Sequence, residues 1–332
     1  MFIMIGVRES RPVQNVCARV RDYMSRPNCV KIVGDFGGTH TRLGAMNNRG
    51  EILAQVDIPT QDFSSQRMLV DRLALEIDKF ELAKEASFGG IGVPCPVDEK
   101  TGEPKGNTPN IKLFSLDGFF RSLSEKTGRE ICAFNDAQVA AMGEAMYGAG
   151  TAHDIVVFHG LGTGYGFAVV VGEKSMATEF GHGKVVNPIF DLNARRCGCG
   201  ARGCAEQYVS GNALALNYQD STAKKLTGKE VGTAFLAGDW AAKESVSRAM
   251  SYLAGHIASF HNIYLSGLHV IGGGVATLGD PLLEILKAKL AMPGVVSRPD
   301  KEELFPQVAL AARPNDAGLL GAGVLAEMKA AE

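Results

Sequence analysis

One arrangement of strands and turns occurs twice in this chain, and it restricts the folds that the sequence can adopt. An apolar run over 31–35 leads into the turn Phe36-Gly37-Gly38-Thr39, and a second strand is expected over 43–46. The same order returns between 155 and 171, where glycines at alternate positions separate two further β-type runs. No fixed-period repeat accompanies this similarity, so the two halves are expected to be variations of one unit in a chain of two lobes.

Strands and helices alternate along the rest of the chain. Leu69, Leu73, Ile77 and Phe80 recur at helical spacing behind a serine, which predicts a helix over 64–85. Further helices are expected over 137–147, 205–218, 239–264 and 318–329, and further strands over 51–54, 88–93, 131–134 and 269–271. This alternation indicates an α/β fold, in which ligands bind beyond the carboxyl ends of the strands.

Length and charge exclude several classes of protein. The 332 residues suit two domains of about 150 residues each. The 34 basic and 36 acidic residues nearly cancel, so a basic face for a nucleic-acid backbone is not expected. No apolar run is long enough to span a membrane, and the first residues, MFIMIGVRES, lack the basic region and cleavage site of a signal peptide.

Glycine turns after predicted strands are the first candidate ligand sites. In the turn that follows Asp35, backbone N–H groups can bind phosphate oxygens, Thr39 can add a hydroxyl and Asp35 can hold hydrated Mg²⁺. A tight hairpin is the alternative interpretation. The loop over 160–166, which contains Gly162, Thr163 and Gly164, and the run Gly272-Gly273-Gly274 also follow β-type runs. Three such turns favour a nucleotide phosphate site, although no P-loop motif is present.

Three of the seven cysteines are crowded into eight positions as Cys197-x-Cys199-x4-Cys204. Three thiolates suit Zn²⁺, which takes four tetrahedral ligands, and His182 is the best placed histidine for the fourth. The alternative is three buried reduced thiols. An odd number of cysteines with such a cluster indicates a reducing cytoplasm rather than a disulfide framework. The only G-x-G-x-x-G match, Gly198 to Gly203, lies in this cluster without a preceding strand, so a dinucleotide site is not predicted.

Asp136 is the candidate general base, because it stands where a predicted strand meets a predicted helix. A carboxylate there can accept a hydroxyl proton during phosphoryl transfer. The alternative is that Asp136 caps the following helix. Asn135 beside it can orient a substrate hydroxyl, and Glu179 and Glu206, which bracket the cysteine segment, suit the vicinal hydroxyls of a sugar.

Taken together, these motifs resemble the ROK family of bacterial sugar kinases and repressors. The resemblance spans about 31–325 and rests on the segments GDFGGTHTR, GVPCPVD, NTPN, FNDAQVAAMGE, GLGTGYG, EFGH, CGCGARGCAE, VIGGGV and AGLLGAG. It implies a two-lobed, actin-like or hexokinase-like ATPase fold of ribonuclease H-like domains with an interdomain cleft. Residues 1–29 would be an N-terminal extension, 30–136 a small domain completed by the helix near 318–332, and 137–317 a large domain with the zinc loop.

The resemblance also implies roles for individual residues. The phosphate elements would be Gly37, Gly38, Thr39 and Arg42, then Gly162, Thr163 and Gly164, with Gly272 to Gly274 against the adenosine. The sugar would meet Asn110, Asn135, Asp136, Glu179, His182 and Glu206, with Asp136 as the base. Zinc would be held by His182, Cys197, Cys199 and Cys204. Cys95, Gln138 and Phe167 depart from the family pattern, and 187–196 is expected to form an added loop at the sugar site.

The implied activity is transfer of the γ-phosphate of Mg·ATP to the primary hydroxyl of a hexose. Glucose is the leading substrate, with an N-acylmannosamine, N-acetylglucosamine or fructose as the alternatives. A homodimer in the cytoplasm is expected, without a nucleic-acid or membrane partner. A sugar-responsive repressor is the alternative from another class, and it is disfavoured because only about 30 residues precede the first glycine turn, where family repressors carry a DNA-binding module.

Overall fold

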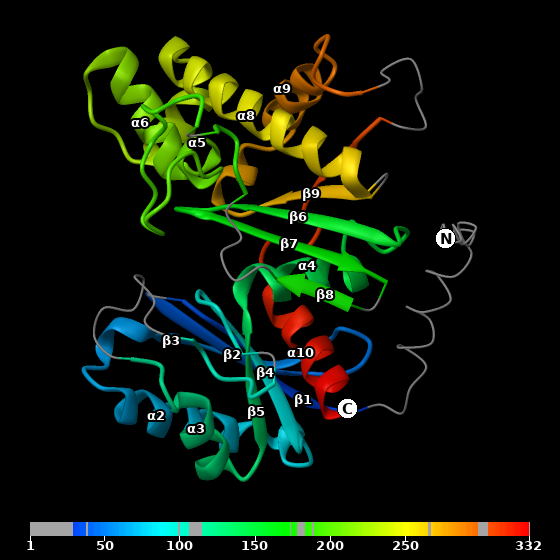
Figure 1. The fold of residues 1–332 in the computed structure, drawn as a ribbon. Helices are drawn as coiled ribbons and strands as arrows, with labels where there is room; N and C mark the ends of the chain where they lie inside the picture. The colour runs from blue at the N-terminus through cyan, green and yellow to red at the C-terminus, as the bar shows by residue number, and fades with distance from the viewer. Residues whose placement is uncertain are drawn as a thin grey trace, which may run out of the picture.

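The computed structural model describes residues 29–331 except 38, 99, 106–114, 173, 178–182, 188, 265–266 and 298–304. Two five-stranded sheets organise this part of the chain (Figure 1). Across the first sheet the order is β3 (Ile52–Pro59), β2 (His40–Met46), β1 (Lys31–Phe36), β4 (Phe88–Val93) and β5 (Glu130–Asn135). Across the second it is β8 (Lys174–Ala177), β7 (Tyr165–Val171), β6 (Ile155–Leu161), β9 (Leu268–Gly272) and β10 (Gln307–Leu310).

The second sheet repeats the topology of the first. In each, the first three strands in sequence pair antiparallel, and the next two join in parallel on the other side of the first strand. The expectation of two variations on one strand–turn–strand unit is therefore confirmed.

Helices fill the space between the sheets and cover their outer faces (Figure 1). On the first sheet, α2 (Gln66–Lys79) and α3 (Phe119–Thr127) bury an apolar core that includes Phe36 and Phe119. Between the sheets lie α4 (Asp136–Tyr147) and α10 (Ala317–Ala330). The outer face of the second sheet is covered by α5 (Glu206–Val209), α6 (Gly211–Thr222), α7 (Gly228–Leu236), α8 (Trp240–Tyr264) and α9 (Asp280–Leu290).

Glycine allows α4 and α10 to cross closely. A Cβ added at Gly143 would lie 2.1 Å from the carbonyl oxygen of Ala317, and one added at Gly321 would lie 1.8 Å from that of Val139. No side chain fits at those distances, so this close crossing requires glycine at both positions. The crossing matters for the site because α4 begins at Asp136 and α10 begins beside Asp35.

Most expected elements are present, and the differences have local causes. The helix expected over 64–85 ends at Lys79 and is followed by the 3-10 turn η3 (Glu81–Ala83). The single helix expected over 205–218 is two helices, because Ser210 is extended and its hydroxyl caps α6 by accepting from the N–H of Ala213. Sequence patterns did not predict α3, α7, α9 or the four-residue strands β8 and β10. The proposed domain boundaries remain a prediction.

Candidate active site

Asp136 is the first residue of α4, directly after β5. The parallel register pairs Val93 with Asn135 and Asp35 with Gly92, so the ends of β1, β4 and β5 lie side by side. Asn135 caps the helix: its side-chain oxygen accepts from the N–H groups of Ala137 at 3.1 Å and Gln138 at 3.3 Å. The alternative role for Asp136 as the helix cap is therefore wrong, because Asn135 fills that position.

The side chain of Asn135 has a second anchor. Its Nδ2 donates to the carbonyl oxygen of Cys95 at 3.3 Å, which fixes the segment after β4 against the start of α4. Cys95, which departs from the family pattern, is buried beside Asp136. Desolvation by burial, with a contribution from the charge of Asp136, raises the pKa of the Cys95 thiol to about 12. This thiol is therefore neutral at physiological pH.

Asp136 as a whole is an exposed residue, and protein atoms surround its carboxyl group closely enough to desolvate it. Desolvation by those atoms and the negative charge of Asp35 raise its pKa to about 6, against the opposing effect of the N–H of Ala137, which donates to Oδ1 at 2.7 Å. A carboxyl with a pKa near neutrality can act as a general base.

Asp35 and Arg42 face each other across β1 and β2. They are register partners, and Nη2 of Arg42 forms an ion pair with Oδ2 of Asp35. Nη1 of Arg42 also donates to the carbonyl oxygen of Asn315, just before α10. A Cβ added at Gly318 would lie 3.6 Å from the carboxyl carbon of Asp35, so the first turn of α10 packs beside this pair. Arg42 therefore neutralises part of the acidic charge near Asp136.

The first glycine turn is a tight hairpin between β1 and β2. The N–H of Gly37 donates to the carbonyl oxygen of His40 at 2.9 Å, and Thr60 holds the turn by donating from Oγ1 to Gly37 and from its N–H to Thr39, both at 2.8 Å. The hairpin interpretation is thus confirmed for the described residues, and it is compatible with a phosphate role. Thr39 is exposed at the tip.

The second and third glycine elements lie together at the end of the second sheet. Gly160 on β6 is the register partner of Gly272 on β9. Gly273 has φ +80°, and a Cβ there would lie 2.7 Å from the carbonyl carbon of Leu161. The loop after β6 is held by α6, whose first N–H, from Gly211, donates to the carbonyl oxygen of Gly162 at 2.8 Å. Glycine at position 273 allows the backbones of these two elements to approach closely, and their role in binding a nucleotide stays a prediction.

The N–H of Asn212 donates to Thr163 at 3.3 Å in the same loop. The start of α4 also approaches this part of the second sheet, because a Cβ added at Gly166 on β7 would lie 3.0 Å from Cβ of Ala137. The residue after Asp136 is thus in contact with the strand that leaves the second glycine loop.

Glu206 joins the second glycine loop to the cysteine cluster. Its Oε2 accepts from the N–H of Tyr165 at 3.2 Å, and Sγ of Cys197 donates to its Oε1 at 3.6 Å. A Cβ added at Gly164 would lie 2.6 Å from Oε2, so glycine is needed at that position for the carboxylate to approach. This contact explains one glycine of the loop by a steric requirement.

The three cysteine Sγ atoms lie within 4.8 Å of one another, and those of Cys199 and Cys204 are 3.6 Å apart. Two sulfurs bound tetrahedrally to zinc at about 2.3 Å lie roughly 3.8 Å apart, so the donor set and its spacing fit that metal. Nζ of Lys184 also donates to Sγ of Cys204 at 3.3 Å. Cys199 is exposed, so the alternative of three buried thiols is wrong.

Four predicted site residues, Gly38, Asn110, Glu179 and His182, lie outside the described residues. Sequence reasoning missed Lys184, which donates to Sγ of Cys204, and Arg195, which donates to the carbonyl oxygen of Gln207 on α5. Neither residue belongs to a local motif. Within the part of the chain that the structure describes, no helix is both long and apolar enough to cross a bilayer.

A protein-family model described as "ROK family" matches residues 32–329 of the chain. The chain belongs to the ROK family. The match spans both sheets, both central helices and the cysteine cluster, and the fold is the two-lobed, actin-like ATPase fold expected from the sequence.

Named relatives of this ROK chain are sugar kinases. The chain is 30% identical over 317 residues to a glucokinase of Thermotoga maritima, which covers 88% of the chain and 96% of that protein. It is 29% identical over 306 residues to an N-acetyl-D-glucosamine kinase of Haemophilus influenzae, with 88% and 97% covered. A solved ROK family glucokinase from Streptomyces griseus, in complex with glucose and AMPPNP, superposes with a TM-score of 0.72 at 27% identity, covering 90% of this chain and 99% of the other.

Proposed function

We propose that this ROK protein is an ATP-dependent hexose kinase that transfers the γ-phosphoryl group to the primary hydroxyl of its sugar, with glucose as the leading substrate. The glucokinase relatives support this assignment. The observation that carries it is Asp136, an exposed residue at the head of α4 whose carboxyl pKa is raised to about 6.

The proposed mechanism begins with the nucleotide between the lobes. The glycine elements at Gly37 to Thr39, Gly162 to Gly164 and Gly272 to Gly274 would present backbone N–H groups to the phosphates and the adenosine, because glycine carries no side chain to obstruct them. Mg²⁺ on the nucleotide, near Asp35, would offset charge on the transferring group. Arg42, which pairs with Asp35, holds that carboxylate in place.

The sugar is proposed to bind between Asp136 and Glu206, with Asn110, Asn135, Glu179 and His182 as further contacts. Asn135 already uses its side-chain oxygen to cap α4 and its Nδ2 to hold Cys95. In the described structure it therefore positions Asp136, and a sugar hydroxyl would have to share one of these atoms. Asp136 accepts the proton of the attacking hydroxyl as the oxygen approaches phosphorus.

Closure of the lobes is proposed to exclude water, which competes with the sugar as a nucleophile. Zinc held by Cys197, Cys199, Cys204 and His182 would be structural and would pin the loop that leads to Glu206. Cys197 already contacts that glutamate.

A second substrate class follows from the relatives. The N-acetyl-D-glucosamine kinase is nearly as similar to this chain as the glucokinase, so N-acylhexosamines are the alternative. A coupled assay of ADP release over a panel of hexoses and N-acylhexosamines decides between them. We expect the highest kcat/KM with glucose. Absence of ADP release with every sugar would refute the proposed kinase activity. A cytoplasmic homodimer is part of the proposal, and light scattering tests the dimer.

A further inference from the structure

The helix that carries Glu206 is too short to be held in place by its own hydrogen bonds. Helix α5 is a single turn, Glu206–Val209, and it ends at the extended residue Ser210. A helix leaves its last carbonyl groups without internal partners, and in one turn this applies to nearly all of them. The orientation of Glu206 therefore depends on groups outside α5.

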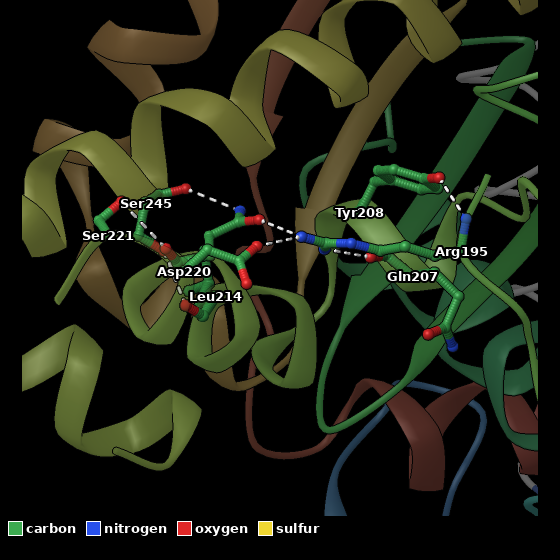
Figure 2. Close-up of polar contacts among 8 residues, drawn as sticks. Arg195, Gln207, Tyr208, Leu214, Asp220, Ser221 and Ser245 are labelled. Atoms are coloured by element: carbon green, nitrogen blue, oxygen red, sulfur yellow. Dashed lines mark hydrogen bonds and ion pairs between the residues drawn. The ribbon is translucent and has the colours of Figure 1, made fainter. Parts of the chain in front are cut away.

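Arg195 supplies those groups (Figure 2). Its Nη1 donates to the carbonyl oxygen of Gln207 at 2.8 Å, in the middle of α5. Its guanidinium carbon lies 5.2 Å from the centre of the Tyr208 ring, and its backbone N–H donates to the Tyr208 hydroxyl at 2.8 Å. One residue thus contacts both residues that follow Glu206, through its side chain and its backbone.

The other end of the guanidinium is fixed to α6. Nη2 donates to Oδ1 of Asn217 at 2.9 Å and pairs with Oδ2 of Asp220 at 3.1 Å. Asn217 is buried and donates in turn to the carbonyl oxygen of Ser245 on α8 at 3.3 Å. Arg195 is therefore tied to the packed pair of α6 and α8, while Asp220 is 58% exposed at the edge of the network.

Arg195 is also part of the cysteine segment. Its carbonyl oxygen accepts from the N–H of Gly203 at 3.0 Å, next to Cys204, and Cys197 follows two residues later. A displacement of Arg195 would move the thiol cluster and α5 together. Glu206 contacts that cluster through Cys197 and the second glycine loop through Tyr165.

We propose that Arg195 is a positioning residue that sets the orientation of the Glu206 carboxylate and, through it, the affinity for the sugar. The inference rests on the proposed sugar kinase function. A planar guanidinium can bind Gln207, Asn217 and Asp220 at once, whereas the single ammonium of lysine cannot reproduce this geometry.

The test compares Arg195→Met, Arg195→Lys and the matched control Asp220→Asn, which removes the exposed partner and keeps the bonds to Gln207 and Asn217. We expect Arg195→Met to raise the sugar KM about tenfold or more, in the range typical of lost supporting contacts. Its kcat and its KM for ATP should stay within about twofold of wild type. Arg195→Lys should be intermediate, and Asp220→Asn should match wild type, as exposed ion pairs contribute little.

Two further measurements distinguish failure of the positioning role from failure of the proposed kinase function. A residue with only a structural role would lower Tm and the active fraction without changing the sugar KM, so an unchanged KM in Arg195→Met overturns the proposal. If Arg195→Met does not fold, an unchanged sugar KM in Arg195→Lys overturns it. Calorimetric titration with glucose reports binding without turnover: wild type that binds glucose but releases no ADP refutes the kinase function alone, and weaker binding by the variants still supports the positioning role.

Discussion

The negative charge of Asp35 raises the pKa of the Asp136 carboxyl, in addition to the larger rise that desolvation causes. The two residues are far apart in sequence and meet because β4 lies between β1 and β5 in parallel register. Arg42 binds Asp35 and offsets part of its charge. The base and the proposed Mg²⁺ ligand are thus electrostatically coupled through the first sheet.

This coupling predicts the pH dependence of the reaction. A base must be deprotonated to accept a proton, so kcat/KM should fall as pH falls through about 6, the pKa of Asp136. Asp35→Asn removes one cause of the raised pKa, so the midpoint should move to lower pH even though kcat decreases. Initial rates from pH 4.5 to 8 with saturating Mg²⁺ measure both midpoints. A midpoint that stays in place, or rises, would contradict the coupling.

Replacing the base itself should separate catalysis from binding. Asp136→Asn keeps the size of the side chain, and Asn135 still caps α4, so the fold should persist. We expect kcat to fall by about 10² or more, a usual effect for loss of a general base, while the calorimetric Kd for the sugar changes only a few-fold. Turnover equal to wild type would remove Asp136 from the mechanism.

Local sequence signals placed Asp136 correctly at the junction of a strand and a helix, while its role as the base stays a prediction. An apolar run ending at an asparagine, followed by helix formers, marks the junction of β5 and α4 without any tertiary information. The glycine elements were found for the same reason, since a glycine turn after a strand is a local pattern. The break at Ser210 was missed although a serine cap was available, because the apolar pattern continues across it.

Contacts between residues far apart in the chain could not be predicted from the sequence. Arg195 does not belong to any recognisable motif, and its partners Gln207 and Asp220 lie 12 and 25 positions away in the chain. Its role appears only when α5 and α6 fold back onto the cysteine segment. The cysteine spacing, in contrast, predicted a cluster because its members lie within one short loop.

Removing one thiol should test the metal site. Cys199→Ser deletes an exposed member of the cluster, and we expect loss of zinc together with a raised sugar KM, because the loop next to Glu206 is no longer pinned. Cys29→Ser, which changes a cysteine outside the cluster, is the matched control and should keep its metal. Zinc per chain is measured by atomic absorption. Full zinc content in Cys199→Ser would rule out the assigned ligand set.

Buried histidines form a network in the second lobe that the sequence analysis did not identify. His159 on β6 bonds Tyr165 through Nδ1 at 2.8 Å and His269 on β9 through Nε2 at 3.0 Å. The ring of His256 on α8 packs near His159, with centroids 6.2 Å apart. These four side chains come from four elements and meet only in the folded core.

The network predicts that the protein loses stability in mild acid. Burial lowers the pKa of His256 to about 4 and of His269 to about 3, and lowers that of His159 well below its usual value. The unfolded chain, with histidine pKa values near 6.5, therefore binds more protons, so the free energy of unfolding should fall from about pH 6.5 towards 4, by up to about 1.4 kcal/mol per pH unit for each histidine. His256→Gln should make the slope of the free energy of unfolding against pH shallower by about one proton. Urea unfolding between pH 5 and 7.5 measures the slopes, and equal slopes for wild type and His256→Gln would contradict the assignment.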